Sequence, residues 1–153
     1  MQTVDLAACA EIACGRCASG APVPQVRILT RPPVFADVDR LTTVVEHAIR
    51  NAQDATPPEG GIRVEVTERS GRPVLTVVDT GTGMDEEFVR ERLFRPFDTT
   101  KGARGMGIGA FQVREYLRSL GGDVEVESEP GRGTTLRLVF AETPATAMSR
   151  RAG

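Results

Sequence analysis

The residues best suited to chemistry lie between Val77 and Gly109. A β-rich run there ends on Asp79, and a Gly-x-Gly turn formed by Gly81 and Gly83 follows directly. A carboxylate at a strand end can accept a hydrogen bond from the exocyclic amine of a purine, and glycines leave room for the base beside the backbone. This pattern predicts a purine site at the end of the strand.

A second glycine-rich stretch extends this prediction toward phosphate. Gly105, Gly107 and Gly109 alternate at the start of a predicted helix. Without side chains, their backbone N–H groups stay free for phosphates, and the positive end of the helix dipole favours the same anions. Lys101 and Arg104 are cations beside this stretch, and each can serve equally as a phosphate contact or as a solvated surface charge. Together the two stretches predict an ATP site.

Composition sets the class of protein. The chain has 153 residues, 40% apolar and 26% charged, which predicts one globular domain with an adequate core. Its net charge of −2 lacks the basic surplus of a general nucleic-acid binder. No apolar run approaches the ~20 residues of a membrane span and no signal peptide appears, so we expect a cytoplasmic domain.

Three cysteines, Cys9, Cys14 and Cys17, crowd the N-terminus. The last two have the spacing of a redox or zinc pair. Zinc needs four ligands, however, and the only histidine is His47, in a different element. We therefore expect reduced thiols without a role in chemistry.

One long helix should position part of the site. Asp37 is a suitable N-cap, and the apolar residues that follow keep helical spacing as far as Ala55. His47, Asn51 and Asp54 form a polar stripe along one edge of the apolar face. An edge stripe is half-buried, which suits the lining of a groove.

The other elements follow from periodicity and turn residues. We expect helices at 1–13, 85–93 and 109–120, strands at 26–30, 62–67, 74–79, 124–126 and 136–140, and loops at 15–24 and 129–133. This order predicts a two-layer α/β sandwich, in which about three helices cover one face of a mixed sheet of about five strands. The expected organisation is a leading segment at 1–24, the domain at 25–140 and a flexible tail at 141–153.

Five stretches resemble the motifs of the GHKL ATP-binding fold, which gyrase, the Hsp90 chaperone, histidine kinases and MutL share. Residues 46–55 resemble its N box and residues 79–83 its first glycine box. Residues 94–97 resemble the F box, 105–109 the second glycine box, and 131–134 the closing one. The ordered set covers roughly residues 35–140 and is specific to this superfamily.

The stretch Pro-Phe-Asp-Thr-Thr-Lys at 96–101 is similar to that of sensor histidine kinases. Residues 47–58 and 95–122 most resemble the PrsK-type kinase of the PEP-CTERM/exosortase system. The resemblance implies the catalytic domain of a protein-histidine kinase in a two-component system, cytoplasmic within a membrane-anchored protein. Its implied partners are a response regulator and a dimerisation domain bearing the phosphoacceptor histidine, which we expect to lie outside this chain; neither nucleic acid nor membrane should contact this fragment.

The resemblance also implies roles for single residues. Asn51 would offer its side-chain oxygen to Mg²⁺, which bridges the phosphates of ATP or ADP. Asp79, supported by Thr134, would accept the adenine amino group. Asn51 and His47 are the catalytic candidates. The implied nucleotide-binding set is Asn51, Asp54, Asp79, Gly81, Gly83, Thr99, Thr100, Lys101, Gly105, Met106, Gly107, Ile108, Gly109 and Thr134.

Three other functions of this superfamily remain open. A GHKL ATPase would carry a catalytic Glu at position 47, where this chain has His47, and Glu46 is one residue off and points about 100° away on a helix. A serine kinase of the anti-sigma-factor type fits the length, but residues 94–101 fit sensor kinases better. A decayed binding module is disfavoured by the intact Asn51, Asp79 and glycine set.

Overall fold

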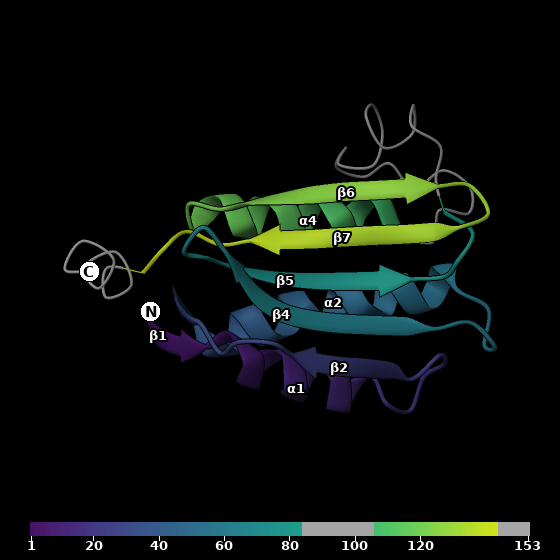
Figure 1. Cartoon of the computed structure of the whole chain (residues 1–153), viewed down its shortest axis with the longest axis horizontal. Helices are drawn as coiled ribbons and strands as arrows, with labels where there is room; N and C mark the ends of the chain where they lie inside the picture. The colour runs from purple at the N-terminus through teal and green to yellow at the C-terminus, as the bar shows by residue number, and fades with distance from the viewer. Residues whose placement is uncertain (84–105, 144–153) are drawn as a thin grey trace.

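A computed structural model describes residues 1–83 and 106–143, except for the side chains of residues 106–109. In chain order the elements are β1 (Gln2–Asp5), α1 (Leu6–Arg16), β2 (Pro24–Ile28), β3 (Pro33–Ala36), α2 (Val38–Ala55), β4 (Ile62–Arg69), β5 (Arg72–Asp79), α4 (Met106–Ser119), β6 (Asp123–Glu129) and β7 (Gly133–Val139). The helices α1, α2 and α4 lie together on one face of a sheet, which forms the second layer (Figure 1).

The sheet has five strands in the order β2-β4-β5-β7-β6. The β2–β4 pair is parallel and the other pairs are antiparallel. Strands β1 and β3 form a separate antiparallel ribbon. The predicted two-layer α/β sandwich with a mixed five-stranded sheet is therefore confirmed.

The predicted start of the N-terminal helix is wrong. Residues 2–5 form β1, and α1 begins only at Leu6 because Asp5 caps it, with its Oδ1 accepting from the Ala7 N–H at 3.1 Å. Strand β3 was not predicted, because Pro33 reads as a strand breaker; a proline is nevertheless tolerated at the first residue of a strand.

Helix α2 matches its prediction closely. Asp37 caps it through Oδ1, which accepts from the Arg40 N–H at 3.1 Å. Ile49 is fully buried although it lies off the predicted apolar stripe. The reason is α1, which packs beside α2 and covers a second side of it; the Cys17 Sγ–H there donates to the Glu46 carbonyl at 3.9 Å.

Both predicted hairpins are present, as β4–β5 and β6–β7. Helix α4 starts at Met106, three residues earlier than predicted, and ends at Ser119. The predicted helix at 85–93 lies outside the described residues. In the parts of the chain that the structure describes, no helix combines the length and apolar character needed to cross a membrane.

The three cysteines are unbridged and buried, and all belong to the core between the helices and the sheet. Burial raises the pKa of each thiol, to about 11 for Cys14. Thiolates form rarely under such conditions, so these residues act as small core side chains.

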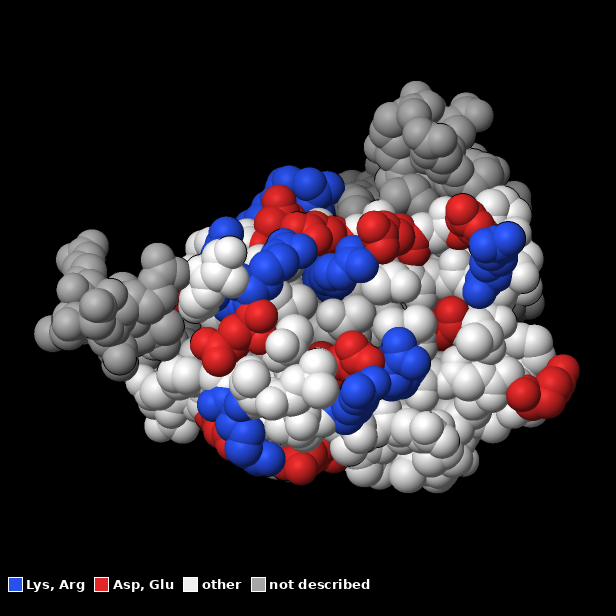
Figure 2. Space-filling model, in the orientation of Figure 1, with Lys and Arg blue, Asp and Glu red and all other residues white. Residues whose placement is uncertain are grey.

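The opposite face of the sheet is open and carries charges of both signs, interspersed across the strands (Figure 2). Opposite charges pair across the strands: Arg69 on β4 contacts Glu125 on β6 at 2.7 Å, and Arg137 on β7 contacts Glu127 on the neighbouring β6 at 2.8 Å. Exposed pairs of this kind stabilise a fold only weakly. The open face is therefore a solvated, mixed-charge surface.

Candidate functional site

Asp79, the last residue of β5, is buried and rigidly held. Its Oδ1 accepts from the Gly81 N–H at 2.9 Å and from the Thr134 N–H at 3.2 Å. Its Oδ2 makes no hydrogen bond to any described residue. Burial raises the pKa of Asp79, and the two backbone N–H groups partly offset that rise. The result is a fixed carboxyl group with one oxygen available to accept a hydrogen bond from a ligand.

The loop after Asp79 is fixed on three sides by backbone hydrogen bonds. The Thr82 N–H donates to the Ala55 carbonyl at the end of α2 at 3.1 Å. The Thr80 N–H donates to Gly61 O at 3.1 Å, and the Gly131 N–H donates to Thr82 O at 2.7 Å. The loop thus joins α2, the turn before β4 and the β6–β7 turn.

The glycines of this loop have a packing reason that sequence reasoning did not find. A Cβ on Gly81 would overlap the Ala55 carbonyl oxygen, and one on Gly83 would overlap that of Glu129. Gly83 also has a φ of +72°, which favours glycine. Close approach of backbone to backbone therefore requires both glycines. Their predicted role in admitting a base stays a prediction.

A hollow of about 810 Å³ lies at the end of the sheet around the β6–β7 turn, and Asp79, Thr134 and Ser128 are among its lining residues. These three are register partners on β5, β7 and β6. Ser128 is a candidate that sequence reasoning missed. Its signal was the predicted hairpin itself, because counting outward from the turn places Ser128 opposite Thr134.

The polar stripe on α2 lies beside this loop. Asn51 is half-buried and precedes Ala55 by one helical turn, about 6 Å along the axis. Its side-chain amide makes no hydrogen bond to any described residue. His47 and Asp54 are exposed, and His47 lines a separate hollow of about 360 Å³ between α2 and α4 with Phe111. Asn51 is therefore the member of the stripe best placed to meet a ligand held at Asp79.

Glu46 points away from this stripe. Its carboxylate pairs with Arg50 at 2.8 Å and with Arg16 of α1 at 3.6 Å. The helical offset predicted from the sequence is confirmed, because Glu46 lies on the α1 side of α2. It is not a base for the ligand site.

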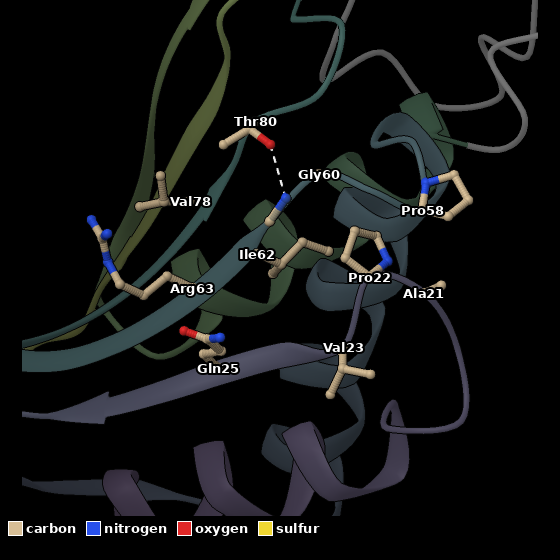
Figure 3. A pocket seen from close by; sticks show the side chains of 11 residues that line it. Ala21, Pro22, Val23, Gln25, Pro58, Gly60, Ile62, Arg63, Val78 and Thr80 are labelled. Atoms are coloured by element: carbon tan, nitrogen blue, oxygen red, sulfur yellow. Dashed lines mark hydrogen bonds between the residues drawn. The ribbon is translucent and has the colours of Figure 1, made fainter.

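A second pocket, of about 400 Å³, lies where the starts of β2 and β4 meet the end of β5 (Figure 3). Thr80 faces it, and its Oγ1 accepts from the Gly61 N–H at 2.9 Å. Val23 and Pro58 are among the other lining residues. Val78 and Thr80 also line the hollow that contains Asp79, so the two hollows adjoin at the end of β5.

The residues present fit an adenine nucleotide and its metal. The unpartnered Asp79 Oδ2 suits a 6-amino purine, and the Asn51 amide oxygen is a hard-cation ligand. Among the described residues, no three His, Cys, Asp or Glu side chains gather as a metal group. The predicted contacts Thr99, Thr100, Lys101 and Gly105 lie outside the described residues. The predicted contacts Met106, Gly107, Ile108 and Gly109 form the first turn of α4.

Comparison with known proteins agrees with this fit. Residues 36–144 match the family model of the histidine kinase-, DNA gyrase B- and HSP90-like ATPases. The chain is 35% identical to the sensor histidine kinase ZraS of Escherichia coli over 109 residues, which are 71% of this chain and 23% of ZraS. It is 33% identical to the sensor protein SrrB of Staphylococcus aureus over 103 residues, 65% of this chain and 18% of SrrB. The chain thus spans less than a quarter of these relatives.

Solved structures share the fold. The catalytic domain of the histidine kinase ThkA aligns with a TM-score of 0.80 at 22% identity, covering 95% of this chain and 97% of that one. The mycobacterial sensor histidine kinase MprB aligns with a TM-score of 0.73 at 23% identity, covering 91% and 95%. The chain belongs to the histidine kinase-, DNA gyrase B- and HSP90-like ATPase family.

Proposed function

We propose that this domain positions Mg-ATP for phosphoryl transfer to a histidine on a dimerisation domain of the same kinase. The observation that carries the proposal is the Asp79 carboxyl group, with one oxygen held by two backbone N–H groups and the other unpartnered among the described residues. This kinase would pass the phosphoryl group to a response regulator. Within the family we propose the PrsK type, and a membrane-anchored full-length protein, on the resemblance of residues 47–58 and 95–122.

In this mechanism Asp79 orients the nucleotide by its base. The adenine amino group donates to Oδ2. The buried Oδ1 accepts two hydrogen bonds, which prevent the carboxyl group from turning. Asn51 would hold the cation through its amide oxygen. Bound Mg²⁺ would supply neutralisation of the phosphate charge. The domain's own contribution is therefore orientation of ATP rather than proton transfer.

Hydrolysis of ATP is a weaker candidate function. A hydrolase needs a base that activates water, and the carboxylate beside the expected position, Glu46, is engaged by Arg50 and Arg16 on the α1 side of α2. His47 is exposed on α2, and we expect no stable phosphorylation of it. Labelled phosphate that stays on His47 after incubation with ATP would contradict this.

Calorimetric titration with ADP and a non-hydrolysable ATP analogue, with and without Mg²⁺, tests nucleotide binding. Asp79→Asn should lose binding. Asp123→Asn is the matched control, because Asp123 pairs with Arg114 and Arg118 at the start of β6 instead. Failure of the folded wild-type domain to bind either nucleotide would refute the proposal.

Phosphoryl transfer needs a second experiment. The dimerisation domain of the full-length protein is added in trans with labelled ATP, and acid-labile phosphohistidine is measured. We expect label on the added domain only when the catalytic domain carries Asn51, with Asn51→Ala abolishing it. Equal labelling by Asn51→Ala would show that Asn51 does not hold the cation.

A further inference from the structure

Ser128 lies beside the candidate purine site. Its hydroxyl group contacts that of Thr134, and we call this pair of hydroxyl groups the relay. Its Oγ–H donates to the Gly133 carbonyl at 3.1 Å, and its Oγ lies 2.8 Å from Thr134 Oγ1. Thr134 in turn donates its backbone N–H to Asp79 Oδ1. A chain of polar contacts therefore runs from β6 through β7 to the carboxyl group on β5.

Counting protons sets the direction of this relay. A hydroxyl group has one hydrogen and two acceptor lone pairs. A backbone carbonyl can only accept, so both contacts of Ser128 Oγ are hydrogen bonds only when its single hydrogen points to Gly133 O. The 2.8 Å contact is then a hydrogen bond only if Thr134 donates its own hydrogen to Ser128 Oγ. Thr134 Oγ1 consequently presents lone pairs, and no proton, to its remaining neighbours.

We propose that Ser128 is a positioning residue for base selection, which holds the Thr134 hydroxyl as an acceptor and so makes the pocket prefer a 6-amino purine to a 6-oxo purine. The inference rests on the proposed function, because it concerns the same nucleotide site. A 6-amino group, or a water that it binds, donates to such an acceptor. A 6-oxo group would instead face two acceptors, Asp79 Oδ2 and Thr134 Oγ1, without a donor for its oxygen.

Removing Ser128 should release the Thr134 proton. In Ser128→Ala the Thr134 hydroxyl can rotate and donate to a 6-oxo group, directly or through water. The ratio of ADP affinity to IDP affinity should then fall about three- to tenfold, the value of one neutral hydrogen bond, chiefly because IDP binds better. Ser128→Thr keeps the hydroxyl and should keep the wild-type ratio.

The experiment measures ADP and IDP dissociation constants by calorimetry for the wild type, Ser128→Ala, Thr134→Val and the double variant. Because Ser128 acts through Thr134, Ser128→Ala should not change the ratio in the Thr134→Val background. Ser119→Ala, which deletes a hydroxyl at the end of α4, is the matched control and should leave the ratio unchanged. Thermal unfolding confirms that each variant is folded, and Ser128→Cys replaces alanine if the hairpin fails to fold.

The results separate the two proposals. An unchanged ratio in folded Ser128→Ala that still binds ADP overturns the role of Ser128 and leaves the proposed function intact. An equal change in the Thr134→Val background also overturns it, because the effect would not pass through Thr134. A wild-type domain that binds neither ADP nor IDP overturns both.

Discussion

The Asp79→Asn variant tests the roles of the two carboxyl oxygens separately. The side-chain oxygen of the introduced amide can still accept from the N–H groups of Gly81 and Thr134, so the internal contacts of the loop are kept. The amide nitrogen takes the place of Oδ2 and presents hydrogen to the ligand. An acceptor for the adenine amino group thereby becomes a donor, with almost no change in shape.

The expected loss of nucleotide affinity follows from hydrogen-bond energies. A hydrogen bond to a charged group is worth about 2 kcal/mol, and facing the ligand amine with a second donor costs about 1 kcal/mol more. A total of about 3 kcal/mol weakens binding roughly 150-fold. Stability should not fall, because the pKa of Asp79 is raised by burial: the folded state disfavours the carboxylate, and the substitution removes that charge.

The assay pairs calorimetry with ADP and denaturant unfolding of the empty domain at several pH values. A raised folded pKa means that Asp79 contributes most to stability below its ordinary pKa of 3.8 and loses that contribution as the pH rises through the folded value. The wild type should therefore lose stability relative to Asp79→Asn between acid and neutral pH. Unweakened ADP binding by the variant, or a loss of more than about 2 kcal/mol of its stability at neutral pH, would refute this reasoning.

Three further outcomes test the same structure. In denaturant titrations, Gly83→Ala should lower the free energy of unfolding by about 3 kcal/mol and Gly131→Ala by about 1 kcal/mol. Both glycines have a positive φ, but only a Cβ on Gly83 would overlap a backbone carbonyl oxygen. Equal losses would contradict the close approach. A thiol reagent at pH 8 should label the native protein far more slowly than the unfolded one, which exposes all three cysteines; fast native labelling of Cys14 would contradict its burial. ADP binding should weaken as the pH falls through the folded pKa of Asp79, with proton release on binding seen as a buffer-dependent enthalpy; a pH-independent affinity would exclude the carboxylate as acceptor.

Local signals predicted most of the fold. Asp37 capped α2 as expected, and the Ser70-Gly71 turn, where both residues have positive φ, closed the β4–β5 hairpin. What sequence reasoning missed depends on long-range contact. The β1–β3 ribbon joins segments about thirty residues apart, and Ile49 is buried by α1 rather than by its own amphipathic pattern. Neither feature has a period or a turn residue that marks it.

The candidate site likewise contains residues that the sequence predicts and contacts that it does not predict. Asp79 was predicted from its place at a strand end beside a glycine turn, and the role of Asn51 from the resemblance of residues 46–55 to the N box. The contacts that hold the loop end on the carbonyl groups of Ala55, Gly61 and Thr82, and every residue type carries such a group, so sequence cannot mark them. Gly81 and Gly83 indicate close packing of the loop only indirectly, because a side chain at either position would overlap a backbone carbonyl oxygen.

Ser128 is an intermediate case. Once the turn at 129–133 is accepted, antiparallel pairing places residue 128 opposite residue 134, and the observed register has that pairing. A hydroxyl directly across from Thr134 could therefore have been found without a structure. The direction of the relay could not, because it depends on Ser128 donating to the Gly133 carbonyl, a contact that only three-dimensional geometry shows. The proposed role of Ser128 in base selection thus combines a position that the sequence predicts with a contact to Gly133 O that only the structure shows.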